Sequence, residues 1–251
     1  MKNIIKKILN KAGLEIRLSP PRDIALGING DVIAKAMPYT MTSAERMFSL
    51  CEAVRYVVTN GIPGDIVECG VWKGGSMLAV ALTLVNLNSM EKNIYLFDTF
   101  EGMSTPGNND VYDNGKPAFQ LLKEDSSDDE KSAWCCVSIE RVRSVMFSSG
   151  YDKDKIHFIK GRVEDTLPRF APSDISILRL DTDFYQSTCC ELEHLFGRIS
   201  HRGVIIVDDY GSWKGVREAW DEFIRKNKVN ILMNRIDYSG RIGVVIKERG
   251  F

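Results

Sequence analysis

The chain has 251 residues, 44% of them hydrophobic and 27% charged, which is enough for one large α/β domain with a buried core. Its 33 basic and 34 acidic side chains leave a net charge of -1, so the composition lacks the basic excess that favours binding to nucleic acid or an anionic surface. We therefore expect a small-molecule partner and no nucleic acid.

The cysteines and the apolar runs indicate in which cellular compartment the protein is expected. No two cysteines have the Cys-x-x-Cys spacing, and two adjacent doublets make a poor disulfide framework, so reduced thiols are expected. The six are Cys51, Cys69, Cys135, Cys136, Cys189 and Cys190. No apolar run approaches the ~20 residues of a membrane span, and the N-terminus lacks the apolar core of a signal peptide. These features predict a cytoplasmic protein without a transmembrane span.

The predicted elements begin with a short helix over residues 1–18, which has isoleucine and leucine on one side and lysines around it. Such a segment docks on its own domain or on a sister subunit, and peripheral contact with a membrane surface is the alternative. A second helix is predicted from Thr42, as the N-cap, to Asn60, where Asn60 and Gly61 form a stop signal.

Strands and helices then alternate. A strand at residues 66–69 leads into a glycine-bearing turn at 70–75 and a mostly apolar helix at 76–87. Further strands are expected at residues 94–98, 156–160, 175–180, 204–207, 229–233 and 242–247. Repeated alternation of strand and helix predicts an α/β fold with a twisted, mostly parallel sheet that helices cover on both faces.

The chain turns polar between residues 101 and 155, where an acidic run at 124–130 precedes a predicted helix at 138–147. We interpret this stretch as an insertion over the site or as a partly disordered segment. The expected organisation is an N-terminal helical extension and lid at residues 1–60, followed by the α/β domain at 61–251 with its insertion at about 101–155.

Two acidic pairs follow neighbouring strands. Asp181 and Asp183 come directly after the strand at 175–180, and Asp208 and Asp209 follow the apolar run that ends at Val207. Because the carboxyl ends of parallel strands meet at the rim where open α/β sheets bind ligands, these side chains should converge there. Four adjacent carboxylates repel one another without a cation, and hard oxygen ligands suit Mg2+.

The glycine turn and the acid that ends the second strand belong together. The turn lies between a strand and a helix, where glycines let a ligand approach the backbone. Asp98 lies 28 residues past Gly70 and can accept hydrogen bonds from both ribose hydroxyls of a nucleoside. A carboxylate at Glu68 would repel a pyrophosphate, so these features favour S-adenosylmethionine over a dinucleotide.

Several longer motifs stand in order along the chain. GIPGDIVECGVWKGG spans residues 61–75, FDTFEGM spans 97–103, and LDTDFYQST spans 180–188. Shorter matches lie at residues 39–41, 165–168 and 208–210. Together these motifs resemble the macrocin O-methyltransferase (TylF-type) family of sugar O-methyltransferases, and the resemblance runs from about residue 39 to about residue 223.

The resemblance implies a class I methyltransferase fold, which is Rossmann-like, with a mostly parallel seven-stranded sheet and helices on both faces. It also implies Mg2+-dependent transfer of a methyl group from S-adenosyl-L-methionine to a hydroxyl, commonly that of a sugar on a glycosylated natural product or glycan. In these roles Asp181, Asp208 and Asp209 hold the metal and Asp183 is the general base. Family members are often dimers or larger, so a homo-oligomer is expected.

The resemblance further assigns the cofactor contacts. The predicted set is Glu68, Gly70, Ser76, Asp98, Arg162, Asp165 and Asp181. Glu68 and Gly70 should face the methionine part, Asp98 the ribose, and residues 161–165 the adenine edge. Ser76 either donates to the cofactor carboxylate or caps its helix.

Two other enzyme classes use similar features. A catechol-type O-methyltransferase has a similar metal and carboxylate site, which acts on a flat aromatic diol. An NAD(P)-dependent oxidoreductase would use the same glycine turn and Asp98, but it normally needs a Tyr-Lys pair or a histidine as proton relay and has no need for four clustered carboxylates. The three histidines fall away from the acids and are interpreted as structural or surface groups.

Overall fold

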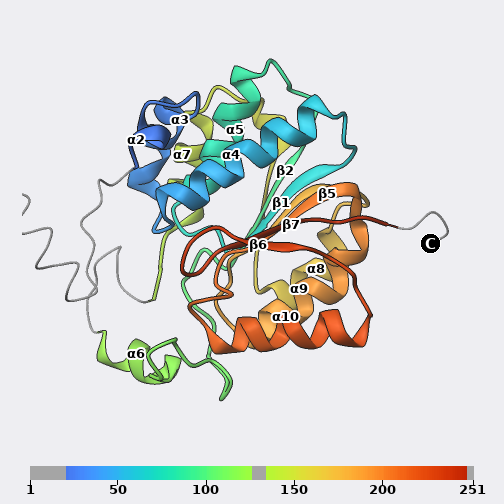
Figure 1. Cartoon of the computed structure of the whole chain (residues 1–251). Helices are drawn as coiled ribbons and strands as arrows, with labels where there is room; N and C mark the ends of the chain where they lie inside the picture. Colours follow the sequence, from blue (N-terminus) through green and yellow to red (C-terminus); the bar gives the residue numbers. More distant parts are fainter. Residues whose placement is uncertain (1–20, 126–133, 248–251) are drawn as a thin grey trace, which may run out of the picture.

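The computed structural model describes residues 21–125 and 134–247 (Figure 1). The helix expected at residues 1–18 and most of the acidic run at 124–130 lie outside these ranges. The described part is built around a seven-stranded sheet with the order β3-β2-β1-β4-β5-β7-β6. Its strands are β1 Asp65–Cys69, β2 Ile94–Asp98, β3 Ile156–Lys160, β4 Ile175–Leu180, β5 Ile199–Val207, β6 Met233–Arg235 and β7 Arg241–Val244.

The sheet is mostly parallel, as predicted. β3, β2, β1, β4 and β5 pair in parallel, whereas β7 is antiparallel to both β5 and β6. This order places β1 and β4 side by side at the centre of the sheet. β2 and β3 lie on one side of this pair, and β5, β7 and β6 lie on the other. The carboxyl ends of these central strands form the crevice in which α/β sheets bind ligands.

Helices cover both faces of the sheet (Figure 1). They are α2 Arg22–Ala25, α3 Gly30–Ala36, α4 Ala44–Thr59, α5 Gly75–Asn86, α6 Ala118–Glu124, α7 Ile139–Phe147, α8 Val163–Phe170, α9 Tyr185–Leu195 and α10 Lys214–Lys226. Short 3-10 turns are η1 Met37–Tyr39, η2 Lys153–Lys155 and η3 Phe196–Arg198. In Figure 1, α3, α4, α5 and α7 lie on one face, and α8, α9 and α10 lie on the other.

Two apolar cores result, one on each face. Met47 of α4, Leu78 of α5 and Ile66 of β1 share one core, whereas Val67 of β1 and Leu192 of α9 belong to the other. Because successive strand side chains point to opposite faces, Ile66 and Val67 supply different cores. Each fully buried aliphatic side chain of this size contributes roughly 1.5–3 kcal/mol to stability.

The start of α4 differs from the prediction by one residue. Ser43, not Thr42, is the N-cap, and its hydroxyl accepts a hydrogen bond from the backbone N–H of Arg46 at 3.1 Å. Thr42 turns its hydroxyl toward the carboxylate of Asp208 instead. The predicted stop is confirmed, because Asn60 is the C-cap and Gly61 has φ of 59°.

Several strand boundaries also differ: β1 begins one residue early at Asp65, and β7 spans Arg241–Val244 instead of 242–247. β5 begins at Ile199, five residues before the predicted start at Val204, because the polar residues around Arg202 interrupt the apolar run without ending the strand. β6 begins at Met233 instead of Val229, because the Val229 N–H still bonds to the carbonyl of Ile224 beyond the end of α10.

The polar stretch after β2 packs against the carboxyl ends of the strands. Asp110 is 2% exposed, and its carboxylate accepts from the N–H groups of Gly107 at 2.6 Å and Tyr185 at 2.7 Å. Isolated bridges join Val111 to Pro117 and Tyr112 to Trp213. The predicted helix at 138–147 is confirmed as α7, which packs in the core beside α5.

Two further findings concern the described residues. All six cysteines are free thiols. In residues 21–125 and 134–247, no helix has both the length and the apolar character to cross a bilayer.

Candidate active site

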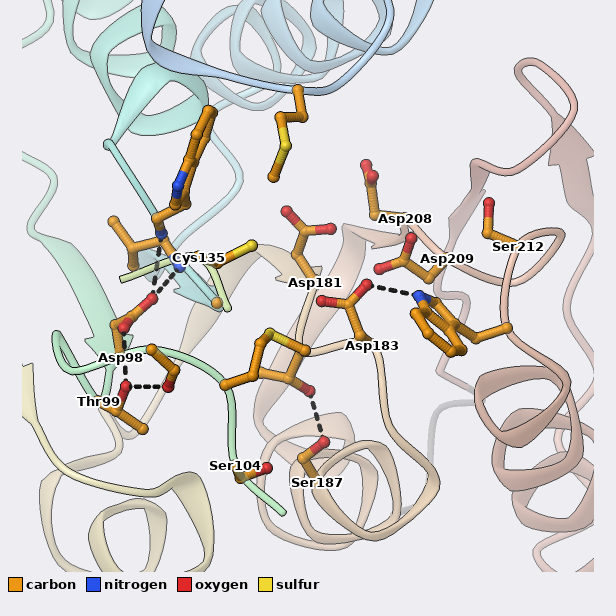
Figure 2. Close-up of a pocket in the computed structure, with 18 of the residues that line it drawn as sticks. Asp98, Thr99, Ser104, Cys135, Asp181, Asp183, Ser187, Asp208, Asp209 and Ser212 are labelled. Carbon is orange, nitrogen blue, oxygen red and sulfur yellow. Dashed lines mark hydrogen bonds between the residues drawn. The ribbon is translucent and has the colours of Figure 1, made fainter. Parts of the chain in front are cut away.

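A cavity of about 830 Å³ opens at the carboxyl ends of β1, β2, β4 and β5. Eight of the residues predicted to form the site line it, namely Gly70, Ser76, Asp98, Arg162, Asp181, Asp183, Asp208 and Asp209. Figure 2 shows the four acids from β4 and β5 on one side of this space and Asp98 on the other. Two predicted contacts, Glu68 and Asp165, do not line the cavity.

The glycine turn is fixed by backbone geometry and by Asp98. Gly70 has φ of 83°, and a Cβ atom there would lie 2.0 Å from the carbonyl oxygen of Asp181, so a larger residue would push β1 and β4 apart. Oδ2 of Asp98 accepts from the N–H groups of Val71 at 2.6 Å and Trp72 at 3.1 Å. Its Oδ1 accepts from the N–H of Phe100 at 2.7 Å. Oδ2 already accepts two N–H groups, so Oδ1, whose other contact is the Thr99 hydroxyl at 3.4 Å, is the oxygen that can turn to a ribose hydroxyl.

Ser76 and Arg162 both line the cavity, at the starts of two helices. Gly74 is the N-cap of α5, so Ser76 stands inside the first turn with its side chain 5% exposed and does not cap the helix. Arg162 is the N-cap residue of α8, with its guanidinium 3.3 Å from Glu164. Asp165 lies on the exposed side of that first turn, so α8 carries it away from the cavity.

Asp181, Asp208 and Asp209 form an oxygen cluster. One carboxylate oxygen from each lies within 4.8 Å of the others. Removal from bulk water raises the pKa of both Asp181 and Asp209, and the charge of Asp208 raises each of them further. Oδ2 of Asp209 is buried without a hydrogen-bond partner. These are the properties of a donor set that fits a divalent cation, because a cation would favour the ionised carboxylates and bind the orphan oxygen.

Arg179, which sequence reasoning missed, lies directly beneath the cluster. Its side chain is 3% exposed, and Nη1 donates to Glu68 at 2.7 Å and to Asp181 at 2.5 Å, while Nη2 donates to Asp208 at 2.6 Å. The nearby carboxylates raise the pKa of this guanidinium above its ordinary value even though burial opposes that shift. A signal was present in the sequence, because Arg179 is the one basic residue in the buried strand ISILRL.

A second arginine reaches the cluster from α4. Arg46 forms an ion pair through Nη1 with Asp208, and its Nε donates to Asp237 at 3.0 Å. Asp208 thus has a guanidinium on each of its two oxygens. Sequence reasoning also missed Arg46, since only the folded chain brings position 46 next to position 208.

Glu68 occupies the strand position opposite Arg179, which explains its place below the cavity. The side chain is 1% exposed, and its burial raises the pKa to about 7, with Arg179 opposing the shift. Glu68 therefore supports the cluster through Arg179 in this structure and does not face the cavity.

Asp183 stands two residues beyond Asp181 with φ of 67°, an unusual backbone conformation for a residue other than glycine. Burial, followed by the charge of Asp181, raises its pKa to about 7. The indole N–H of Trp213 donates to Oδ1 of Asp183 at 2.7 Å, which Figure 2 marks with a dashed line. A carboxylate with a pKa near neutrality and facing a cavity has the properties of a general base.

Solved structures share this fold. The O-methyltransferase NovP superposes with a TM-score of 0.73 at 27% identity over 83% of both chains. The calicheamicin methyltransferase CalS11 superposes with a TM-score of 0.62 over 96% of this chain and 91% of its own, and at 16% identity it supports the fold alone. The sheet order and the carboxyl-end cavity are those of a class I methyltransferase.

Sequence comparisons define the family. The model of the macrocin-O-methyltransferase (TylF) family matches residues 19–243, and the chain belongs to this family. Among curated relatives, the 8-demethyl-8-(2,3-dimethoxy-alpha-L-rhamnosyl)-tetracenomycin-C 4'-O-methyltransferase of Streptomyces olivaceus is 29% identical over 82% of this chain and 75% of its own. The mycinamicin III 3''-O-methyltransferase of Micromonospora griseorubida is 26% identical over 80% and 76%. The chain is therefore an S-adenosylmethionine-dependent O-methyltransferase, as predicted.

Proposed function

We propose that this enzyme methylates a hydroxyl of a sugar carried by a natural product or glycan, and that Mg2+ assists the transfer. The observation that carries the proposal is the convergence of four strand-end carboxylates on the same cavity as the glycine turn and Asp98. The names of two relatives support the sugar acceptor, since one includes a rhamnosyl group and another is a 3''-O-methyltransferase of mycinamicin III.

Asp181, Asp208 and Asp209 would hold the metal, because their oxygens are grouped closely enough to share one ion. Bound there, Mg2+ supplies Lewis-acid chemistry that lowers the pKa of a sugar hydroxyl, and S-adenosylmethionine supplies the methyl group from its sulfonium. Arg179 and Arg46 balance part of the cluster's negative charge and hold Asp208 in place from both sides.

Asp183 is the proposed general base. Transfer forms a bond from the acceptor oxygen to the methyl carbon and breaks the bond from sulfur to that carbon, so the hydroxyl proton needs an acceptor at the cavity wall. Asp183 lines the cavity and has one oxygen already oriented by Trp213. A carboxylate with a pKa of about 7 is partly ionised at neutral pH, and the ionised form is the one that can accept a proton.

The cofactor side of the cavity is proposed to consist of Gly70, Ser76, Asp98 and Arg162. Gly70 lets the cofactor approach the backbone, and Oδ1 of Asp98 offers an acceptor to the ribose. Cys135 from the polar stretch also lines the cavity between these groups and the acids (Figure 2). Burial raises the pKa of its thiol to about 12, so it stays neutral and takes no part in proton transfer.

The first test is calorimetric titration of S-adenosylmethionine and S-adenosylhomocysteine into the protein with Mg2+ and with EDTA, with NADH as the control. We expect binding of both sulfur nucleosides and none of NADH. Radiometric methyl transfer is then measured with catechol and with the compounds in the names of two relatives, namely mycinamicin III and, from a 28% identical O-methyltransferase of Streptomyces niveus, demethyldecarbamoylnovobiocin. Turnover of a glycoside that stops in EDTA would support the proposal. Turnover of catechol alone would assign the catechol-type reaction instead.

The base assignment has its own test. Asp183→Asn should abolish turnover and leave S-adenosylhomocysteine affinity within about twofold of the wild type, because Asp183 faces the acceptor and not the turn that holds the cofactor. Asp154→Asn, in an exposed residue of η2 that does not line the cavity, is the matched control. Turnover retained by Asp183→Asn would remove the assignment.

A further inference from the structure

Trp213 connects three parts of the active site. It is the N-cap residue of α10, and its backbone N–H bonds to the carbonyl of Asp209 at 3.0 Å. Its indole N–H donates to Oδ1 of Asp183 at 2.7 Å. One residue thus joins the end of β5, which carries Asp208 and Asp209, to the side chain of the proposed base.

Asp183 needs such a support. Its φ of 67° lies in the left-handed region, which a residue other than glycine keeps only where the surrounding structure holds it there. The carboxylate can rotate about its side-chain bonds, and each orientation presents a different oxygen to the cavity. An indole is rigid and is a donor only, so it can fix Oδ1 without taking or giving the proton of the reaction.

Trp213 is itself held by the polar stretch after β2. The ring of Tyr112 meets it edge-on with centroids 5.2 Å apart, and the ring of Phe184 does so at 5.6 Å. The N–H of Lys214 bonds to the carbonyl of Val111 at 2.9 Å, and that of Asp113 bonds to the carbonyl of Ser212 at 2.8 Å. These backbone bonds lie on both sides of the Tyr112–Trp213 bridge.

Tyr112 and Trp213 both line the cavity. The residues that hold the indole therefore also form part of the wall against which an acceptor would rest. The indole is thus part of the cavity wall while its N–H holds the carboxylate of Asp183.

We propose that Trp213 is a positioning residue that orients the carboxylate of Asp183 toward the acceptor and links that orientation to the 110–113 segment. The inference rests on the proposed role of Asp183 as the base. Trp213 acts through Asp183, so its loss should slow turnover while leaving cofactor binding intact.

The test compares Trp213→Phe with Trp220→Phe. Phenylalanine keeps an aromatic ring against Tyr112 and Phe184 and removes the N–H. Trp220 lies on the same helix, is 4% exposed and packs against Phe196 away from the cavity, so it controls for the general loss of an indole. We expect kcat of Trp213→Phe to fall about 10- to 100-fold with KM for S-adenosylmethionine within about twofold. Trp220→Phe should keep the wild-type kcat.

A crystal structure of each variant with S-adenosylhomocysteine provides a readout that needs no acceptor. We expect Asp183 to keep one carboxylate orientation in Trp220→Phe and to rotate or take several orientations in Trp213→Phe. An unchanged Asp183 in Trp213→Phe, or an unchanged kcat, would overturn the inference. Failure of the proposed function has a different signature, namely wild-type turnover by Asp183→Asn. If none of the acceptors is methylated, the crystal structures alone decide the role of Trp213.

Discussion

Replacement of Arg179 by methionine should destabilise the fold more than any surface substitution. The guanidinium, 3% exposed, pairs with Glu68, Asp181 and Asp208 at 2.5 to 2.7 Å. Methionine fills a similar volume but leaves these carboxylates without their shared partner. Removal of one partner from a buried ion pair costs about 3–5 kcal/mol.

Two features determine how much stability Arg179→Met loses within the range of about 3–5 kcal/mol. Glu68 has a pKa of about 7, so it can take up a proton and avoid a buried unpaired charge. Asp208 keeps its ion pair with Arg46. The loss should therefore lie nearer 3 than 5 kcal/mol, which lowers Tm by roughly 10 °C in a chain of this size.

The assay is urea unfolding followed by circular dichroism in EDTA, then repeated with Mg2+. Arg143→Met on the exposed surface of α7 is the control, and it should change stability by less than about 1 kcal/mol. Mg2+ should stabilise Arg179→Met more than the wild type, because the variant's cluster carries more uncompensated negative charge. A loss below about 1 kcal/mol in EDTA would refute the reasoning, since it would mean that the guanidinium does not balance the carboxylates.

Three further predictions concern single carboxylates. Asp98→Ala should weaken S-adenosylhomocysteine binding about tenfold or more in calorimetry, because the turn and the ribose lose the same acceptor, and unchanged affinity would contradict that role. Asp209→Asn should remove Mn2+ binding measured by electron paramagnetic resonance and leave nucleoside binding in EDTA within about twofold; retained Mn2+ affinity would exclude Asp209 as a ligand. Burial raises the pKa of Glu191, so between the unfolded pKa of about 4.3 and the raised folded pKa the native state keeps a proton that the unfolded chain releases, and stability falls as pH rises through that range. Glu191→Gln lacks this slope, so its stability relative to the wild type should rise by up to about 1.4 kcal/mol per pH unit over that range. Tm is measured from pH 5 to 8, with the exposed Glu193→Gln as control. A stability difference that does not vary with pH would contradict the raised pKa.

Sequence patterns predicted three of the parallel strands closely because each is a short apolar run that stands out from its polar neighbours. β2, β3 and β4 have the predicted bounds, and every residue of β4 is buried. The errors fall where local pattern and tertiary pairing disagree. β5 continues past a register shift near Arg202, where the Arg202 N–H bonds to the carbonyl of Val245, and β6 is a three-residue edge strand set by its register with β7.

The acids of the site were predictable for a simple reason: each follows its strand within three residues, and parallel strands bring their carboxyl ends together. Asp165 was placed in the site by motif alone, but it falls on the exposed side of α8. Arg162 is the N-cap residue and has extended backbone, so its place beside the cavity does not carry over to Asp165, which stands in the first turn of α8 on its exposed side.

The cations were harder to predict because charge balance is a property of the folded site and not of a motif. Carboxylates that converge in a low-dielectric cavity raise one another's pKa, so the fold needs positive charge next to them before any metal binds. Arg179 supplies it from the strand that carries Asp181, and Arg46 supplies it from α4. Since Thr42 also turns toward Asp208, the start of α4 is part of the active site. A domain boundary at residue 60 would therefore separate Arg46 from Arg179, the two residues that balance the charge of Asp208. Both α4 and the sheet contribute residues to the site.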